Sequence, residues 1–277
     1  MRPLVVVVTG ASSGIGAASA QRLASTGHCV FGWSRSGTVG TAAGKPLVGS
    51  ELAAHGVRAH AVDVSDADAV ARAFQLVVRS EGRVDAVVHA AGTALAGPLE
   101  DTSVEEARDY IAVNLLGAIH VSQAALPHLR AAAPSTLLMV SSLAGEIALP
   151  YQALYTAAKF GLEGLCQSLR FEVERLGVRL VVVRPGSVAT PLTDHRRLVA
   201  AGAPYVRAGK AIALNDADER AGIPAETVAA AVAAAVEGSD QRLTIAVGHL
   251  RERIAVPLRR VLPASWFHRL LATRYEQ

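Results

Sequence analysis

Near its start the chain reads LVVVVTGASSGIG, residues 4–16, and this stretch decides the fold class. The apolar run Leu4–Val8 has the length and composition of a strand that is buried on both faces of a parallel sheet. The glycines after it allow a tight turn, and the helix that follows presents unpaired N–H groups and the positive end of its dipole to an anion. The stretch therefore predicts a dinucleotide-binding turn; the alternative is a tight strand–helix turn without a ligand.

Short apolar runs alternate with helical stretches along the rest of the chain. This alternation predicts a doubly wound α/β Rossmann fold with a seven-stranded parallel sheet, forming a single domain over residues 1–248. The expected strands are 4–8, 29–33, 59–62, 86–89, 136–140, 180–183 and 243–247, and the expected helices include 16–25, 66–79, 104–130 and 153–176. Two segments break the pattern: 36–50, expected as a loop before a short helix, and 191–222, expected as a substrate loop or lid.

The composition of the 277 residues excludes several classes of protein. The formal charge is only +3 and no block of five basic residues occurs, so nucleic acid is not an expected partner. Cys29 and Cys166 form neither a disulfide framework nor a metal motif, and no metal site is expected. The longest apolar run, Val228–Val236, is too short to span a membrane, and no signal sequence is recognisable, so we expect a cytoplasmic protein.

Tyr155 and Lys159 stand four residues apart and therefore share one face of a predicted helix. A nearby ammonium favours the phenolate, so we expect Lys159 to lower the pKa of Tyr155. A tyrosine with a pKa near the working pH is a good acid for carbonyl reduction and a good base for alcohol oxidation. Ser142, thirteen residues before the tyrosine, is the expected partner for the developing oxyanion.

Further motifs extend this pattern over most of the chain: Asp63-Val64, His89-Ala90-Ala91-Gly92, Asn114, and Pro185-Gly186 with Thr190. With residues 9–16, Ser142 and Tyr155-x-x-x-Lys159, they make the chain similar to the short-chain dehydrogenase/reductase family. Within the family, Gly97–Glu100 and 159–166 resemble the 17β-hydroxysteroid and retinol dehydrogenase subgroup. The chain departs from the family at His89-Ala90, where two asparagines are usual, and we expect His89 to be a core residue at a strand end.

The resemblance implies a role for each matching residue. Tyr155 would exchange a proton with the substrate oxygen, Ser142 would hold that oxygen, and Lys159 would bind the nicotinamide ribose. Asn114 would hold a water that links Lys159 to solvent. The expected cofactor-binding residues are Gly10, Ser12, Ser13, Gly14, Ile15, Gly16, Ser34, Arg35, Asp63, Val64, Ala91, Gly92, Lys159, Pro185, Gly186, Val188 and Thr190.

The end of the second strand indicates which cofactor is preferred. A carboxylate there would bind the ribose 2′-hydroxyl of NAD, whereas an arginine accommodates the 2′-phosphate of NADP. The chain reads Gly-Trp-Ser-Arg-Ser at 32–36, without a carboxylate. We therefore expect NADP(H) to be favoured over NAD(H), with Arg35 on the phosphate; the alternative is that Arg35 is a solvated surface residue.

The expected substrate-binding residues are mostly apolar: Leu95, Ser142, Leu143, Leu149, Tyr151, Tyr155, Ser187 and Leu192, with Pro150 and Val188 nearby. They predict a small-molecule substrate that is bulky and apolar and carries a carbonyl or a secondary alcohol, such as a steroid, retinoid or aryl ketone. The alternatives are a 3-oxoacyl thioester reductase, with Arg196, Arg197 and Arg207 as a docking patch for a carrier protein, and a catalytically silent NADP-binding regulatory protein.

Two features concern partners. Helices 104–130 and 153–176 are rich in Ala and Leu on more than one face, and in related enzymes such helices pair, so a homodimer or homotetramer is expected. The segment 249–277 carries six arginines against two glutamates, mixed with apolar residues, and is expected as a basic helical extension. It would cover the pocket, join an interface, or lie on a membrane surface.

Overall fold

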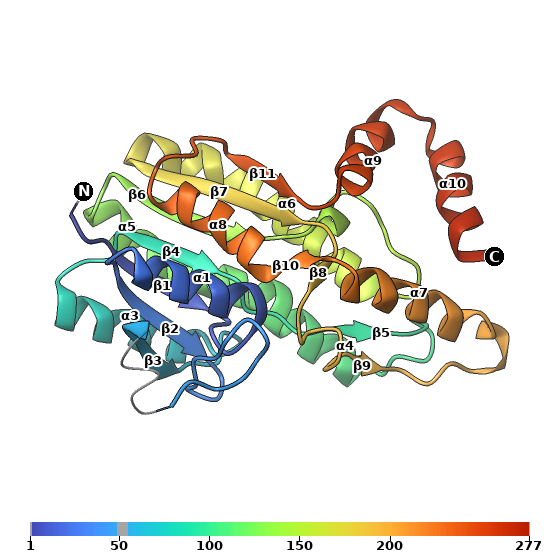
Figure 1. Ribbon diagram of the computed structural model, residues 1–277, viewed down its shortest axis with the longest axis horizontal. Helices are drawn as coiled ribbons and strands as arrows, with labels where there is room; N and C mark the ends of the chain where they lie inside the picture. Colours follow the sequence, from blue (N-terminus) through green and yellow to red (C-terminus); the bar gives the residue numbers. More distant parts are fainter. Residues whose placement is uncertain (1, 49–54, 277) are drawn as a thin grey trace.

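The computed structural model describes residues 2–48 and 55–276, and a parallel sheet lies at its centre (Figure 1). The seven strands of this sheet follow the order β11-β7-β6-β4-β1-β2-β3. They are β1 (Val5–Thr9), β2 (Cys29–Ser34), β3 (Val57–Ala61), β4 (Ala86–His89), β6 (Ser135–Val140), β7 (Val178–Pro185) and β11 (Thr244–Val247). The predicted doubly wound fold is confirmed, and each predicted strand starts and ends within two residues of the observed one.

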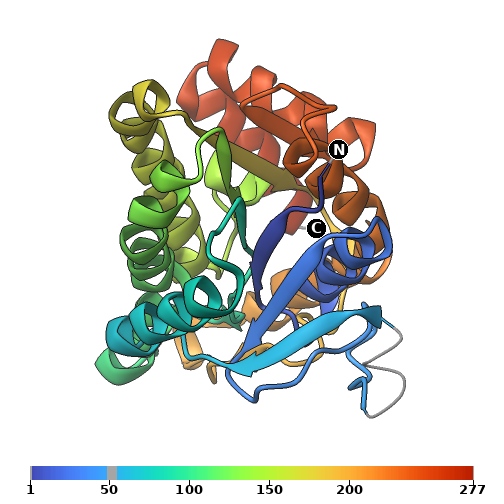
Figure 2. The same ribbon diagram turned by 90° about the vertical axis from the view of Figure 1, so that its left-hand side faces the viewer.

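Helices cover both faces of the sheet (Figure 2). One face packs on α3 (Ala67–Glu81), α5 (Gly117–Ala131) and α6 (Ala153–Val173), and the other packs on α1 (Gly14–Ser25) and α8 (Ala225–Val236). Successive side chains of a strand point to opposite faces, so Val5 and Val7 join the first buried cluster while Val6 and Val8 join the second. This two-sided burial explains why the strands appear in the sequence as unbroken apolar runs.

One continuous helical stretch, Val104–Ala131, has the length and composition of a membrane-spanning helix. It comprises α4 (Val104–Ile111), a π-helical turn η1 (Ala112–Leu116) and α5. Val121, Ala125 and Leu129 of α5 belong to the buried cluster between the sheet and α3, and this packing accounts for the apolar composition of that helix.

The order of the strands determines where a ligand would bind. The chain passes from β1 outward to β2 and β3, and then returns to place β4 on the other side of β1. Thr9, at the end of β1, is in register with Trp33 of β2 and His89 of β4, so the carboxyl ends of these strands meet at one edge. In such sheets the crevice at this topological switch point is the usual ligand site.

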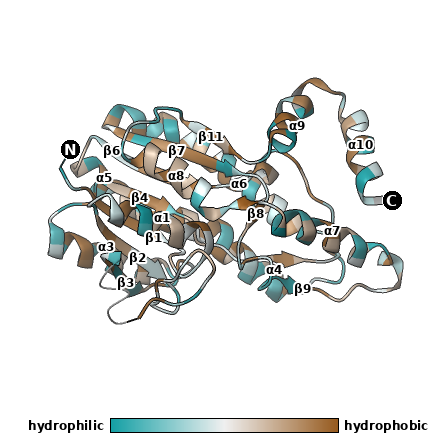
Figure 3. Ribbon diagram, in the orientation of Figure 1, coloured by the Kyte–Doolittle hydropathy of each residue, from teal (hydrophilic) through white to brown (hydrophobic). Residues whose placement is uncertain are grey.

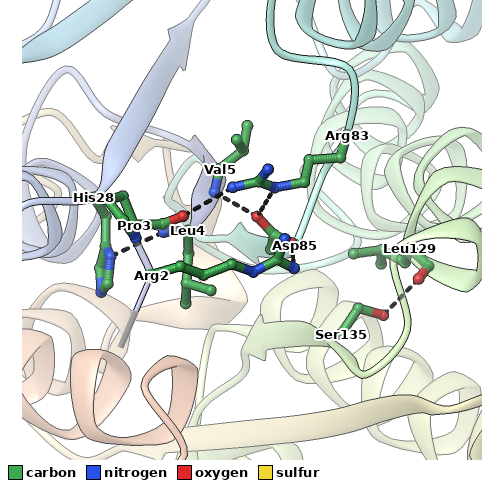
Figure 4. Close-up of polar contacts among 9 residues, drawn as sticks. All are labelled: Arg2, Pro3, Leu4, Val5, His28, Arg83, Asp85, Leu129 and Ser135. Atoms are coloured by element: carbon green, nitrogen blue, oxygen red, sulfur yellow. Dashed lines mark hydrogen bonds and ion pairs between the residues drawn. The ribbon is translucent and has the colours of Figure 1, made fainter.

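The opposite end of the sheet is secured by the buried carboxylate of Asp85 (Figure 4). Its Oδ2 accepts hydrogen bonds from the Val5 N–H (2.8 Å) and from Nε of Arg83 (2.8 Å), and its Oδ1 accepts one from Arg2 (2.9 Å). Two guanidinium groups and a backbone donor thus compensate for the burial of one carboxylate. These contacts hold β1 next to β4, the two strands that flank the switch point.

Segment 191–222 contains more regular secondary structure than the expected substrate loop or lid. Segment 191–222 contains β9 (Arg197–Leu198), the short turn η4 (Ala203–Tyr205) and a thirteen-residue helix, α7 (Ala208–Arg220). Small parallel pairs, β5 (Leu95–Ala96) with β9 and β8 (Val188–Ala189) with β10 (Ile223–Pro224), join it to the body of the molecule. In segment 36–50, Gly40 forms an antiparallel bridge with Pro46, and the prediction of a short helix after this segment falls on residues 49–54, which lie outside the described residues.

The chain ends in two helices, α9 (Leu250–Val261) and α10 (Ala264–Glu276), which lie beyond the carboxyl end of β11 (Figure 1). α10 runs back toward α7 and contacts it. The C-terminal helices therefore approach the same side of the molecule as segment 191–222.

Candidate active site

The glycine-rich loop requires glycine at the places where backbone meets backbone. Gly10 has φ 73°, and a Cβ there would lie 2.7 Å from the carbonyl oxygen of Ala90. A Cβ on Gly16 would lie 2.2 Å from the carbonyl oxygen of Gly10, too close for any side chain. α1 begins at Gly14 and has no acidic residue in its first turn, so its N-terminus keeps its positive potential for an anion.

A cavity extends from this loop to the predicted catalytic residues. It is lined by most of the residues expected to bind the cofactor: Gly10, Ser12, Ser13, Gly14, Ile15, Gly16, Ala91, Gly92, Lys159, Pro185, Gly186, Val188 and Thr190. Asn114, Ser142 and Tyr155 line the same cavity, as do Leu95 and Leu192 from the expected substrate set. The structure thus brings residues from both halves of the chain to one crevice at the switch point.

Ser34, Arg35, Asp63 and Val64 do not line this cavity. Ser34 Oγ donates to the carbonyl of Thr38 (2.7 Å), Arg35 is exposed, and Val64 is buried against Gly117. The reason is that segment 37–48 packs on the glycine-rich loop: the Gly40 N–H donates to Ala11 (3.0 Å), and the Gly14 N–H donates to Ala42 (2.9 Å).

Asp63 lies close enough to Arg35 for the two charges to interact. Its carboxylate accepts hydrogen bonds from the N–H and the hydroxyl of Ser65 (2.9 and 2.6 Å), which lower the pKa of Asp63, and Arg35 lowers it slightly further. Arg35 and Asp63, which were expected near the adenine, are therefore neighbours. They lie beside the cavity and do not line it.

Ser142, Tyr155 and Lys159 come from two neighbouring elements. Ser142 precedes the 3-10 turn η2 (Leu143–Gly145), and its hydroxyl accepts a hydrogen bond from the Ala144 N–H (3.0 Å). Tyr155 and Lys159 share one face of α6, and Lys159 Nζ lies 5.9 Å from the centroid of the tyrosine ring. The same Nζ donates to the carbonyl of Val140 (3.1 Å), which fixes the ammonium at the end of β6.

We predicted that the pKa of Tyr155 is lowered, and for the protein alone this prediction is wrong. Burial raises the pKa of Tyr155, and the hydrogen bond with Ser142 offsets this only in part. Burial also lowers the pKa of Lys159 to about 8, although Glu163 acts in the opposite direction. Tyr155 is therefore protonated at neutral pH, the state required of the acid in carbonyl reduction.

Asn114 lies in the π-helical turn η1, a distortion that is often found at functional sites. Its Nδ2 donates to Thr93 Oγ1 (3.0 Å) and to the Tyr110 carbonyl (2.9 Å), and its Oδ1 accepts from the Thr93 N–H (3.1 Å). Both N–H groups of the Asn114 side chain already donate within the protein. A water held by Asn114 would therefore donate a hydrogen bond to an oxygen atom of this residue. That role stays a prediction.

His89 is a core residue, as expected. It is 2% exposed, and its Nδ1 lies 3.0 Å from the hydroxyl of Thr9. Burial, with a smaller effect of Lys159, lowers its pKa to about 3, so the ring is neutral.

A second cavity adjoins the first at Ser142 and Tyr155 and continues toward α9 and α10. Leu143, Leu149 and Ser187 line it as expected, together with Ala144, Ile147, Ala255 and Leu271. Tyr151 and Pro150 line neither cavity; Tyr151 has φ 56°, and its carbonyl accepts a hydrogen bond from Gly97 (2.8 Å), which directs the chain toward β5.

Most of the exposed lining is apolar, as expected, but the expectation that the pocket holds few fixed charges is wrong. Polar residues missed by the sequence analysis line the second cavity: Asn215, Asp218, Glu219, Arg251, Glu252, Arg274 and Tyr275. Glu219 also lines the first cavity, where it pairs with the buried guanidinium of Arg196 (2.5 Å). The Nδ2 of Asn215 is buried and has no hydrogen-bond partner among the described residues, while its Oδ1 accepts from the hydroxyl of Tyr275 (2.8 Å).

The lowered pKa of Lys159 leads to a prediction about pH. We expect kcat/KM for reduction to fall as the pH rises through about 8, because Lys159 then loses the charge that assists Tyr155. Glu163 raises the pKa of Lys159, so Glu163→Gln should move this fall to lower pH. The measurement is a pH profile of NADPH oxidation for both proteins. An unchanged profile in the variant would assign the fall to another group.

Comparisons with known proteins agree with this geometry. The family model described as short chain dehydrogenase matches residues 4–199. The chain is 34% identical over 198 residues to the 3-ketodihydrosphingosine reductase of Bacteroides thetaiotaomicron, a match that covers 72% of this chain and 69% of that protein. It is 36% identical over 193 residues to 17-beta-hydroxysteroid dehydrogenase type 1 of Mus musculus, covering 69% of this chain and 56% of that protein.

A solved structure is similar over nearly its whole length. The alcohol dehydrogenase from the archaeon Thermococcus sibiricus, complexed with 5-hydroxy-NADP, has a TM-score of 0.71 and 26% identity, covering 90% of this chain and 97% of that chain.

Proposed function

The chain belongs to the short-chain dehydrogenase/reductase family of oxidoreductases, and from this premise we propose that it transfers hydride between NADP(H) and the carbonyl or secondary alcohol of a bulky substrate with a polar substituent. One observation carries the proposal: the glycine-rich loop and Ser142, Tyr155 and Lys159 line a single cavity. A binding turn and an acid–base group are thus placed together, as a hydride-transfer site requires.

The residues of the cavity fit a nicotinamide dinucleotide. The glycine-rich loop, which lines the cavity, and the N-terminus of α1 suit a pyrophosphate, which Ser12, Ser13 and Ile15 would hold. Pro185, Gly186, Val188 and Thr190 would surround the nicotinamide end. When bound, the cofactor supplies or accepts the hydride.

In the direction of reduction, Tyr155 donates its phenolic proton to the carbonyl oxygen as that oxygen gains charge. The Ser142 hydroxyl donates a hydrogen bond to the same oxygen, which stabilises the developing alkoxide. The Lys159 ammonium stabilises the phenolate that remains on Tyr155 until a proton returns. Alcohol oxidation uses the same groups in reverse.

We expect kcat/KM to be higher with NADPH than with NADH, and Arg35→Ala to remove most of this preference. A guanidinium–phosphate hydrogen bond contributes about 1.5–3 kcal/mol, so the variant should lose roughly tenfold or more with NADPH and little with NADH. Steady-state kinetics with both cofactors measure this. A wild-type enzyme that prefers NADH would contradict the assignment.

The lining of the second cavity supports a substrate that has an apolar part and a polar substituent. Leu143, Ile147 and Leu149 suit an aliphatic or ring surface, whereas the unpartnered Asn215 amide and the carboxylate of Glu219 suit a hydroxyl or amino substituent near the carbonyl. A long-chain keto base of the kind named for the Bacteroides relative has both parts. An apolar ketone without such a group would leave the buried amide unpaired, which is costly.

An NADPH-oxidation screen tests this proposal. It compares 3-ketodihydrosphingosine, a 17-keto steroid, retinal, an aryl ketone and an acetoacetyl thioester. We expect turnover to be highest with the keto base and to fall in Asn215→Leu for that substrate alone. Highest turnover with the aryl ketone would contradict the polar recognition, and NADPH binding without any turnover would favour a silent regulatory protein.

The thioester alternative receives little support from the structure. Of the three arginines considered for carrier docking, Arg196 is only 4% exposed in its side chain and pairs with Glu219 inside the cavity. Arg197 is exposed but pairs with Glu106 (2.8 Å), and Arg207 lies exposed before α7. The three side chains therefore do not form one basic surface.

We also propose a homodimer through α6. Ala157, Phe160, Gly164 and Phe171 recur along one exposed side of this helix, and Phe171 is 87% exposed. We expect Phe171→Glu to shift the protein toward monomer in light scattering after size-exclusion chromatography. Leu76→Glu, at an exposed position of α3, is the control and should leave the mass unchanged. A wild-type monomer would contradict the proposal.

A further inference from the structure

The two C-terminal helices have one face turned toward the protein. Ala255, Leu271 and Tyr275 line the second cavity, and Phe267 is 4% exposed. Arg274 and Arg251 both pair with Asp218 of α7, the latter at 3.6 Å, and the Tyr275 hydroxyl donates to Asn215. These contacts hold α9 and α10 against α7 as an outer wall of the cavity.

The other face of the same helices is apolar and exposed. On α9, Leu250, Ile254 and Val261 are spaced as one helix side and are 68%, 52% and 76% exposed. On α10, Trp266 and Leu270 stand four residues apart and are 65% and 55% exposed. We call these five residues the C-terminal apolar stripe. In Figure 3, apolar and polar positions alternate along both helices, as expected of amphipathic helices.

Cationic side chains accompany the stripe. Arg253 and Arg269 are exposed beside the stripe on the same two helices, whereas the Arg259 guanidinium lies 5.9 Å from the ring of the buried Phe267. The carboxylate of Glu252 is turned inward instead, where it accepts from the N–H groups of Ser187 (3.1 Å) and His249 (3.0 Å). The outer surface therefore combines large apolar groups, a tryptophan and arginines.

We propose that the C-terminal apolar stripe docks on an anionic lipid bilayer. Leucine, isoleucine and tryptophan insert at the boundary between acyl chains and headgroups, and flanking arginines bind lipid phosphates. A second copy of this chain suits the surface less, because symmetric pairing would bring arginines against arginines. Docking would place the wall of the second cavity beside the bilayer.

The tryptophan content of the chain gives a direct probe of docking. There are two tryptophans: Trp33 is 1% exposed, inside the sheet, and Trp266 belongs to the stripe. A blue shift of tryptophan emission on adding vesicles therefore reports the burial of Trp266. We expect this shift, and co-sedimentation of the full-length protein, with phosphatidylglycerol vesicles and not with phosphatidylcholine vesicles.

Two sets of variants test the two components of docking. Ile254→Glu with Leu270→Glu should abolish co-sedimentation, whereas the control Leu76→Glu should keep it. Arg253→Ala with Arg269→Ala should weaken partitioning about 25-fold, since each surface arginine contributes roughly fivefold.

Thermal unfolding checks that each variant is folded. A wild type that stays in the supernatant, or that binds both lipids equally, would overturn the proposal. So would a concentration-dependent blue shift without vesicles, which would indicate a second copy.

Discussion

Tyr155→Phe is expected to lower kcat for carbonyl reduction by about 10²–10⁴-fold, the usual contribution of a positioned general acid. The phenyl ring fills the same space on α6, so the cavity keeps its shape and only the proton is lost. Since Tyr155 sits beyond the glycine-rich loop, binding of NADPH should persist. Stopped-flow measurement of a single turnover, with cofactor binding followed by fluorescence, separates the two effects.

The chain offers a matched control for this substitution. Tyr151 lies four residues before Tyr155, ahead of the start of α6, and lines neither cavity. Tyr151→Phe should therefore retain kcat close to that of the wild type. Substantial turnover in Tyr155→Phe would mean that another group delivers the proton, and loss of NADPH binding would mean that the tyrosine has a structural role instead.

The strands and the catalytic pair were predictable because their signals are local. Strands buried on both faces appear as short apolar runs, and β4, at Ala86–His89, was predicted to the residue. Tyr155 and Lys159 are linked by the helical repeat, which sequence spacing specifies directly. The glycine-rich loop is likewise recognisable from the sequence alone, because only glycine fits at positions 10 and 16.

The charged and polar residues of the pocket were not predictable, because their positions depend on contacts between distant segments. Arg196 and Glu219 meet only through the fold of segment 191–222, and Asn215 meets Tyr275 only because α10 returns to α7. Their residue types carry no local pattern that distinguishes a cavity wall from a solvated helix. The direction of the Tyr155 pKa was missed for a related reason: helical spacing gives the neighbouring charge but not the degree of burial.

Substitution of Arg184 is the second change for which we expect a large effect, and this effect is on the stability of the protein. This β7 residue makes a two-pronged ion pair with Glu163 of α6, through Nε (2.8 Å) and Nη2 (2.6 Å). Its Nη1 lies 2.8 Å from Glu146, the residue after η2. The side chains of Arg184 and Glu163 are 11% and 5% exposed. One guanidinium thus joins the strand leading to Pro185-Gly186, the helix that carries Tyr155, and the turn that follows Ser142.

Arg184→Met is therefore expected to destabilise the protein by about 3–5 kcal/mol, because it leaves the buried carboxylate of Glu163 without its cation. Arg184→Lys should restore part of the loss, since an ammonium keeps the charge but not the planar fork. Urea unfolding measures both. The control is Arg220→Met, which breaks an exposed pair with Asp194 (59% and 66% exposed) and should cost no more than about 1 kcal/mol. If Arg184→Met cost no more than this control, the ion pair would not be what holds the three catalytic elements together.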